Sequence, residues 1–242
     1  MMRKASIGAL VASLVLPSLA LAANAPGAAE LAGQQAAPYA RLLVGLSLLS
    51  FIPAALVAMT SFTRIIVTLS FLRHALGMPE TPPNIVLITL AMLLTFFTMA
   101  PTLEQGYRDG VAPFLEGKIE TTQALENGLQ PLKTFMTAHV RDEDLQSVSE
   151  LAKVEPAVQE QDTPLRVLAP AFMLSELRAA FVAGFMIFLP FLLIDLLVAA
   201  ILMALGMMMV PPSSISLPLK VMLFVLIDGW SLLLRALAGI YA

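Results

Sequence analysis

Cysteine is absent from this sequence, and histidine occurs only at His74 and His139. Without cysteine the chain can form no disulfide, no thiolate metal site and no cysteine nucleophile. Two histidines are too few for a histidine-rich metal site. We therefore expect no metal site built on cysteine or on several histidines.

Charge is also scarce. Charged residues make up 13% of the 242 residues, whereas globular proteins average about 25%. Apolar residues make up 58%, and the mean hydropathy is +0.85. This composition excludes a disordered chain and indicates a membrane-associated protein. The net charge of −3 argues against a nucleic-acid partner.

The first residues have the pattern of a secretory signal peptide. A basic start at Arg3 and Lys4 precedes an apolar run, 7–16, which is shorter than the roughly 20 residues that span a bilayer core. The small residues of the expected cleavage region are Ala20, Ala22 and Ala23. We expect a signal peptide over 1–22 and a flexible extracytoplasmic tail over 23–40, with an uncleaved anchor as the alternative.

The next part of the chain is predicted to form a first helical hairpin region over 41–103. Pro53 is expected to kink its first apolar run. The turn residues of 79–83 then force a break, and a second apolar run begins at Asn84.

An acidic segment separates this region from the end of the chain. Residues 104–166 contain twelve of the 17 acidic residues and six of the 14 basic ones, which predicts a water-exposed domain. Residues 167–242 are apolar again, and their prolines predict broken helices in this C-terminal region. Within it, 179–219 fits either one steep crossing with a re-entrant piece or two short helices. Arg64 and Arg73 place the first short connection in the cytoplasm, so the acidic domain is expected outside.

Two amphipathic helices are predicted inside the acidic domain. Their apolar faces are Leu125, Leu129, Leu132 and Met136, and then Leu145, Val148 and Leu151. Asp142, Glu143 and Asp144 precede the second face, where the positive end of a helix dipole favours acidic side chains. We expect both helices to pack against neighbouring copies of the chain, and a solvated hairpin on one subunit is the alternative.

Several charged residues lie in or beside apolar sequence. A charge at mid-bilayer costs at least about 2.5–3.5 kcal/mol, so such side chains face protein or water. We predict buried or inter-subunit positions for Arg64, Arg73, Glu176, Arg178, Asp195, Lys220 and Asp228. Candidate pairs are Glu176 with Lys220, and Asp195 or Asp228 with Arg178 or Arg235; the sequence leaves the pairing open.

Three adjacent methionines, Met207, Met208 and Met209, precede Pro211 and Pro212. Methionine is most often core filler, because its unbranched side chain fits irregular gaps. Repeated around a ring at a helix break, the same residues would form a soft hydrophobic seal against water and ions. Both interpretations stay open at this point.

The sequence resembles the FliP family of flagellar biosynthesis proteins from about residue 42 to about residue 235. The matching strings are 60–67, 72–77, 81–84, 113–119, 170–177, 188–195, 207–212 and 226–230. The resemblance implies an all-α fold of membrane-associated helical hairpins with broken or kinked helices. It further implies assembly into a ring or helical cone around a central pore.

What the resemblance implies for function is protein export. A family member is a core subunit of the flagellar type III export gate, a homo-oligomer in a pentamer-like ring with FliQ, FliR and other flagellar export membrane proteins. Unfolded flagellar proteins are its substrates. The resemblance implies that 167–242 is the pore-forming region, and it implies neither an enzymatic activity nor a cofactor. It lies in the bacterial inner membrane and flagellar basal body, with a periplasmic domain. Met207, Met208 and Met209 would be the pore seal.

Three alternatives belong to other classes or systems. A virulence injectisome contains an equivalent subunit with the same fold and other substrates. A secondary transporter also uses broken helices and midplane charges, but it would normally show inverted repeats, and none is visible. An intramembrane aspartyl protease would pair Asp195 with Asp228, although their flanking residues carry no protease motif.

Overall fold

The computed structural model of the chain describes residues 47, 50, 53–55, 57–154, 163–207 and 209–239. The expected signal peptide with Ala20, Ala22 and Ala23, the tail over 23–40, and Met208 lie outside the described residues. The chain divides into two units, Met1–Pro53 and Ala54–Ala242, and the helices below belong to the second.

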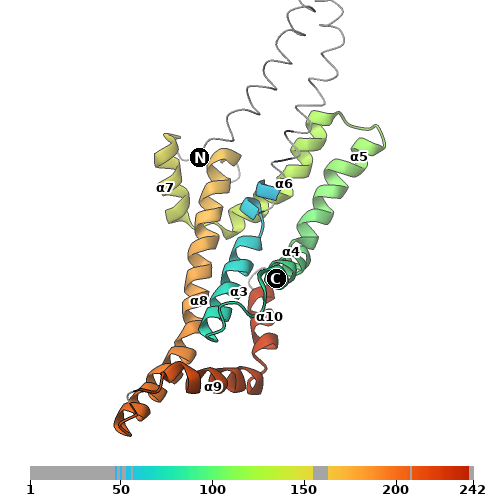
Figure 1. Cartoon of the computed structure of the whole chain (residues 1–242). Coiled ribbons are helices and arrows are strands. Elements are labelled where there is room, and N and C mark those ends of the chain that lie inside the picture. Colours follow the sequence, from blue (N-terminus) through green and yellow to red (C-terminus); the bar gives the residue numbers. More distant parts are fainter. Residues whose placement is uncertain are drawn as a thin grey trace, which may run out of the picture. The chain divides into compact units, whose positions relative to one another are not determined.

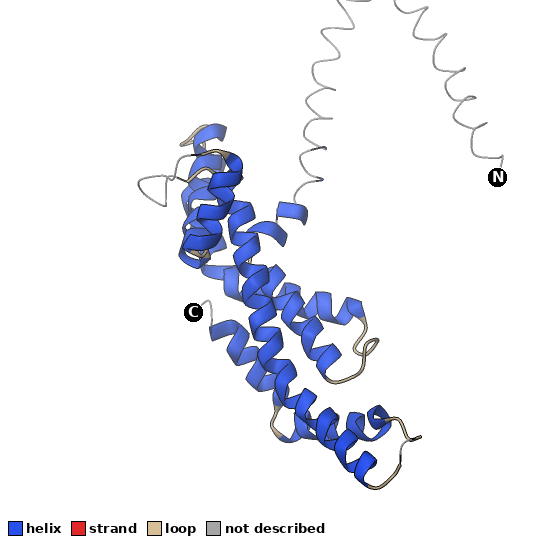
Figure 2. Ribbon diagram, turned by 90° about the vertical axis from the view of Figure 1, so that its left-hand side faces the viewer, coloured by secondary structure: helices blue, strands red, loops and turns tan. Residues whose placement is uncertain are grey.

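Helices joined by turns make up the described part of the chain, in which no strand occurs (Figure 2). The predicted all-α fold is therefore confirmed. In chain order the elements are α3 (Phe62–Ala75), α4 (Asn84–Gly106), the π-helical turn η1 (Tyr107–Val111), α5 (Ala112–Leu115), α6 (Thr121–His139), α7 (Asp142–Ala152), α8 (Leu165–Ala204), α9 (Pro212–Leu226) and α10 (Gly229–Gly239).

Helices α3 and α4 form the first hairpin, and its turn lies where the sequence predicts a break. Gly77 has φ 78°, a left-handed conformation that glycine adopts without steric cost. Pro83 has an extended backbone and no N–H, and α4 begins directly after it at Asn84. Ile65 and Leu69 of α3 then share a core with α4, α8, α9 and α10.

Helix α8 is continuous over 40 residues and contains Pro170 and Pro190. At a rise of about 1.5 Å per residue it is about 60 Å long, twice the roughly 30 Å of a bilayer core. The sequence left two arrangements open for 179–219. In the structure this stretch contains the end of one long helix, which stops at Ala204, and the first part of α9. Helix α9 then bends by 64° into α10.

A second core joins α4, α6 and α8. Met136 of α6 is fully buried there, in contact with a cluster that includes Met99 and Phe172, and Leu132 packs against the cluster. The expectation that this helix face packs on neighbouring copies is therefore wrong for Met136, and it stays a prediction for Leu132, which is half-buried. Leu125 on the same face is 64% exposed, because α6 extends beyond the core.

Two stretches of the described chain are long and apolar enough to cross a membrane, Asn84–Leu115 and Leu165–Ala204, and two bent helix pairs raise the possible number of spans to four. Only 17% of each apolar window is buried within this chain. Large side chains such as Phe97 of α4 and Phe185 and Met186 of α8 point outward. Lipid or other protein must cover these surfaces, because so large an apolar area is not stable in water.

Candidate functional site

Arg64 and Glu176 form an ion pair between α3 and α8. Arg64 Nη2 lies 2.5 Å from Glu176 Oε1, and the side chains are only 9% and 0% exposed. A pair so far from water is stable only while both charges are present, because either charge alone would keep its full desolvation cost. The pair therefore fixes the start of α3 against the first half of α8.

Lys220 of α9 makes a second ion pair, with Asp195 of α8, in which Lys220 is buried and Asp195 is partly exposed. Its Nζ lies 2.6 Å from Asp195 Oδ2 and donates a second hydrogen bond, of 3.1 Å, to the carbonyl oxygen of Ala75. Ala75 is the last residue of α3, where carbonyls have no partner inside the helix. Lys220 therefore joins α3, α8 and α9 at one point.

These contacts differ from the pairs considered from sequence. Glu176 pairs with Arg64 instead of Lys220, and Lys220 pairs with Asp195. The reason is the direction of two neighbouring helices. Helices α3 and α8 run the same way (Figure 1), so the start of α3 meets Glu176 and its end lies near the level of Asp195. Helix register of this kind cannot be read from a single sequence.

The remaining charged residues of the predicted set lie nearer the surface. Arg178 of α8 pairs with Asp144 at 2.9 Å, where the sequence analysis considered Asp195 or Asp228. Arg73 donates to Asn84 Oδ1 at 2.5 Å and so crosses the turn between α3 and α4. Asp228 is exposed at the break between α9 and α10, with a φ of 50°. An inter-subunit role for it stays a prediction.

The methionine turn follows the end of α8. Gly206, with φ 73°, donates to Met203 O, and Met207 donates to Leu202 O. These two hydrogen bonds form a Schellman motif, which ends the helix in a defined geometry. Met207 is 43% exposed and Met209 is 98% exposed. The side chains of Met207 and Met209 therefore point outward. Methionines that fill a core would be buried.

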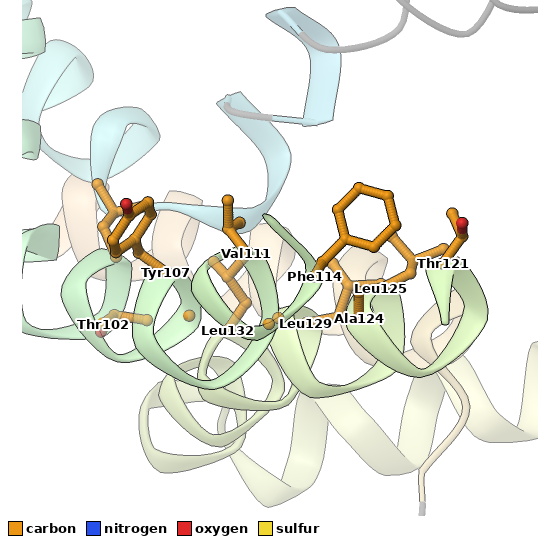
Figure 3. Close-up of a pocket in the computed structure, with 13 residues that line it drawn as sticks. Thr102, Tyr107, Val111, Phe114, Thr121, Ala124, Leu125, Leu129 and Leu132 are labelled. Atoms are coloured by element: carbon orange, nitrogen blue, oxygen red, sulfur yellow. The ribbon is translucent and has the colours of Figure 1, made fainter. Parts of the chain in front are cut away.

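An apolar groove of about 440 Å³ lies between the end of α4, η1 and α6. Tyr107, Val111 and Phe114 project along one side of it, and Leu125 lies on the other (Figure 3). The helices can approach closely here because glycine has no Cβ. A Cβ on Gly110 would lie only 2.6 Å from a carbonyl oxygen of α6. The groove offers hydroxyl groups but no charged side chain.

Metal-ligand clusters of three or more His, Asp or Glu do not occur in the part of the chain that the structure describes.

Sequence reasoning missed two polar residues that the fold brings together. Asp144 of α7, interpreted only as a helix-dipole charge, is 1% exposed and bonded to Ser175 of α8. No local pattern around Ser175 predicts this contact, because it joins residues 31 positions apart.

Comparison with known proteins gives a consistent result. The model of the FliP family matches residues 45–237. The chain is 54% identical over 196 residues to the flagellar biosynthetic protein FliP of Pectobacterium carotovorum, a match covering 81% of this chain and 76% of that protein. Identity to the flagellar biosynthetic protein FliP of Agrobacterium fabrum is 45% over 229 residues, covering 93% and 94%.

A third relative is longer than this chain. The flagellar biosynthetic protein FliP of Buchnera aphidicola subsp. Acyrthosiphon pisum is 54% identical over 196 residues, or 81% of this chain. The match covers 52% of that protein, so the chain spans about half the length of this relative.

Proposed function

The chain belongs to the FliP family, and from this premise we propose that it is a core subunit of the flagellar type III protein export gate. The gate contains several copies of this chain in a ring, together with FliQ and FliR. Unfolded flagellar proteins pass through it across the inner membrane. The names of the relatives favour this system over the virulence injectisome.

The observation that carries the proposal is the position of Asp195. Its side chain is 39% exposed, although it lies in an apolar stretch of α8 where Leu193 and Leu196 are 58% and 65% exposed. Lys220 pairs with one oxygen of this carboxylate, and the part that stays exposed would still be costly in lipid at this depth. This face of α8 therefore borders a neighbouring protein chain or water, as expected for a subunit of a larger assembly around a conduit.

The methionine turn supplies the seal of that conduit. Repeated around the ring, Met207, Met208 and Met209 bring flexible, apolar side chains together at one level. Such a constriction excludes water and ions, because an apolar pore of this kind dewets. Methionine also adapts to irregular shapes, so the seal widens around a passing chain and closes behind it.

The acidic domain, 104–166, lies on the outer side of the membrane, in the periplasm. Its excess of acidic residues and the exposed surfaces of α6 and α7 suit contact with water. The uncovered apolar surfaces of α4 and α8 contact lipid and the partner subunits. The driving force for export comes from other components of the apparatus.

The seal is tested by replacing Met207, Met208 and Met209 with alanine in the complex with FliQ and FliR. We expect the complex to assemble and the cells to admit small ions or dyes that the wild type excludes. A matched control removes three other exposed methionines, Met92, Met186 and Met203. Unchanged permeability with an intact complex would contradict the seal.

A further inference from the structure

Helix α7 contacts α8 in an unusual way, because the two residues that α7 buries are both polar. Asp144 is 1% exposed and Ser149 is 6% exposed. The Ser149 hydroxyl donates back to Leu145 O within α7 itself. Asp144 is therefore the buried residue that reaches α8.

Both oxygens of the Asp144 carboxylate have a partner on α8. Ser175 Oγ donates to Oδ2 at 2.8 Å, and Arg178 Nη2 lies 2.9 Å from Oδ1. The backbone N–H of Arg141 donates to Ser175 Oγ at 3.1 Å. Hydrogen bonds to a carboxylate are stronger than those between neutral groups, and here they are shielded from water at the Asp144 end.

The apolar side chains of α7 are only partly buried. Leu145 packs at the edge of the second core, and Val148 is half-buried. Leu151, the last apolar residue of the predicted face, is 84% exposed. The polar cluster of Asp144, Ser175 and Arg178 is therefore the contact that holds the most deeply buried side chain of α7 on α8.

The backbone leaves the helical conformation at both ends of α7. Arg141, which precedes it, has an extended conformation, and Lys153, which follows it, is left-handed with φ 53°. Neither end of α7 continues into another helix. Loss of its contacts with α8 therefore need not disturb α6 or α8.

The same turn of α8 also holds α3. Glu176, next to Ser175, pairs with Arg64 of α3. Figure 1 shows α3 and α7 on opposite sides of α8. One helical turn of α8 therefore contacts α7 on one side and α3 on the other.

We propose that Asp144, Ser175 and Arg178 form a clip that positions α7 on α8, and that α7 leaves α8 as a unit when the clip is broken. The three are positioning residues, and they act through the placement of α7. The clip gives α7 two states, docked on α8 and released from it. The proposal does not depend on the export function.

Hydrogen exchange on the purified subunit in detergent tests the clip. Asp144→Asn removes the carboxylate charge, and we expect the amides of α7 to exchange roughly tenfold to a hundredfold faster, as loss of hydrogen bonds to a charged group predicts. Exchange in α3 and α8 should stay the same. The control Asp142→Asn removes a charge from the same first turn, at an exposed position, and should change α7 exchange less than about twofold.

A cysteine pair supplies a second test, since the chain contains no cysteine. Asp144→Cys with Ser175→Cys should give fast α7 exchange when reduced and slow exchange once the disulfide, verified by mass, has formed. Equal α7 exchange in the Asp144→Asn and Asp142→Asn variants would overturn the proposal. So would a rise spread equally over α3 and α8, or fast α7 exchange in the oxidised pair.

Discussion

Helices α3 and α7 both lie against α8, but their contacts have opposite character. Helix α3 buries Ile65 and Leu69 completely and brings the ring of Phe71 onto Gly184 of α8. Helix α7 buries a carboxylate and a hydroxyl. An apolar contact is distributed over many side chains, and each contributes a part. A polar contact depends on a few groups in register, so a single substitution can remove most of it.

The ion pair of Arg64 and Glu176 adds a polar element inside the apolar contact of α3. Because both side chains are buried, loss of either one removes an ion-pair partner from a charge that stays in the core. The largest effect of a single substitution is therefore expected at this pair. Smaller effects follow at the α7 contact, then at the glycine contact, and last at the surface.

Glu176→Ala is expected to destabilise the subunit by about 3–5 kcal/mol, because Arg64 remains buried without its carboxylate. The free energy of unfolding in detergent measures this loss, and native gels should show weaker subunit association. Glu143→Ala is the control, since Glu143 is 71% exposed in its contact with Arg178. Similar stability of the two variants would contradict the importance of burial.

Ser175→Ala is expected to cost about 1.5–3 kcal/mol, the range for a hydrogen bond to a charged group. The substitution removes the donor to Asp144 and the acceptor for the Arg141 amide. Ser147→Ala, on the exposed side of α7, removes only a hydroxyl bonded to the backbone of its own helix. If both variants unfold at the same denaturant concentration, the hydrogen bonds of Ser175 do not stabilise the contact between α7 and α8.

Gly184→Ala tests the apolar contact of α3. A Cβ at this position would overlap the ring of Phe71, and overpacking costs about 1–3 kcal/mol. Alanine favours the helix over glycine by about 1 kcal/mol, so the net loss is about 0–2 kcal/mol. Gly239→Ala is the matched control, because nothing lies within 4 Å of its Cβ position. Equal thermal midpoints of the Gly184→Ala and Gly239→Ala variants would contradict a tight contact between Phe71 and Gly184.

Glu116→Gln is expected to have the smallest effect. Glu116 pairs with Lys118 at 2.5 Å, but the side chains are 57% and 70% exposed. Exposed pairs contribute about 0–1 kcal/mol, since water and salt screen both charges. The unfolding free energy should therefore change by less than about 0.5 kcal/mol. A loss as large as that of Ser175→Ala would contradict the ranking by burial.

The sequence predicts the helices better than their contacts. The start of α4 at Asn84 and the helix bearing Leu132 and Met136 follow from turn residues and periodicity, which are local signals. The partner of Glu176 does not, because it depends on which helix lies beside α8 and in which direction. The favourable interaction of Asp144 with the helix dipole already accounts for its place at the start of α7. The sequence therefore gives no further indication of its contact with α8.

The methionines show the same limit in another form. Their adjacency and the prolines after them predict a turn, and the structure places Met207 and Met209 on one. Whether they meet their counterparts in other copies depends on an assembly that one chain does not contain. The seal and the ring therefore stay proposals that rest on family membership and on the exposure of these side chains.

Native mass spectrometry of this chain co-expressed with FliQ and FliR tests the assembly most directly. The account predicts a particle that contains several copies of the chain together with both partners. The Glu176→Ala variant should yield fewer such particles. A single copy that stays monodisperse in detergent and restores export to cells lacking the native protein would contradict the account.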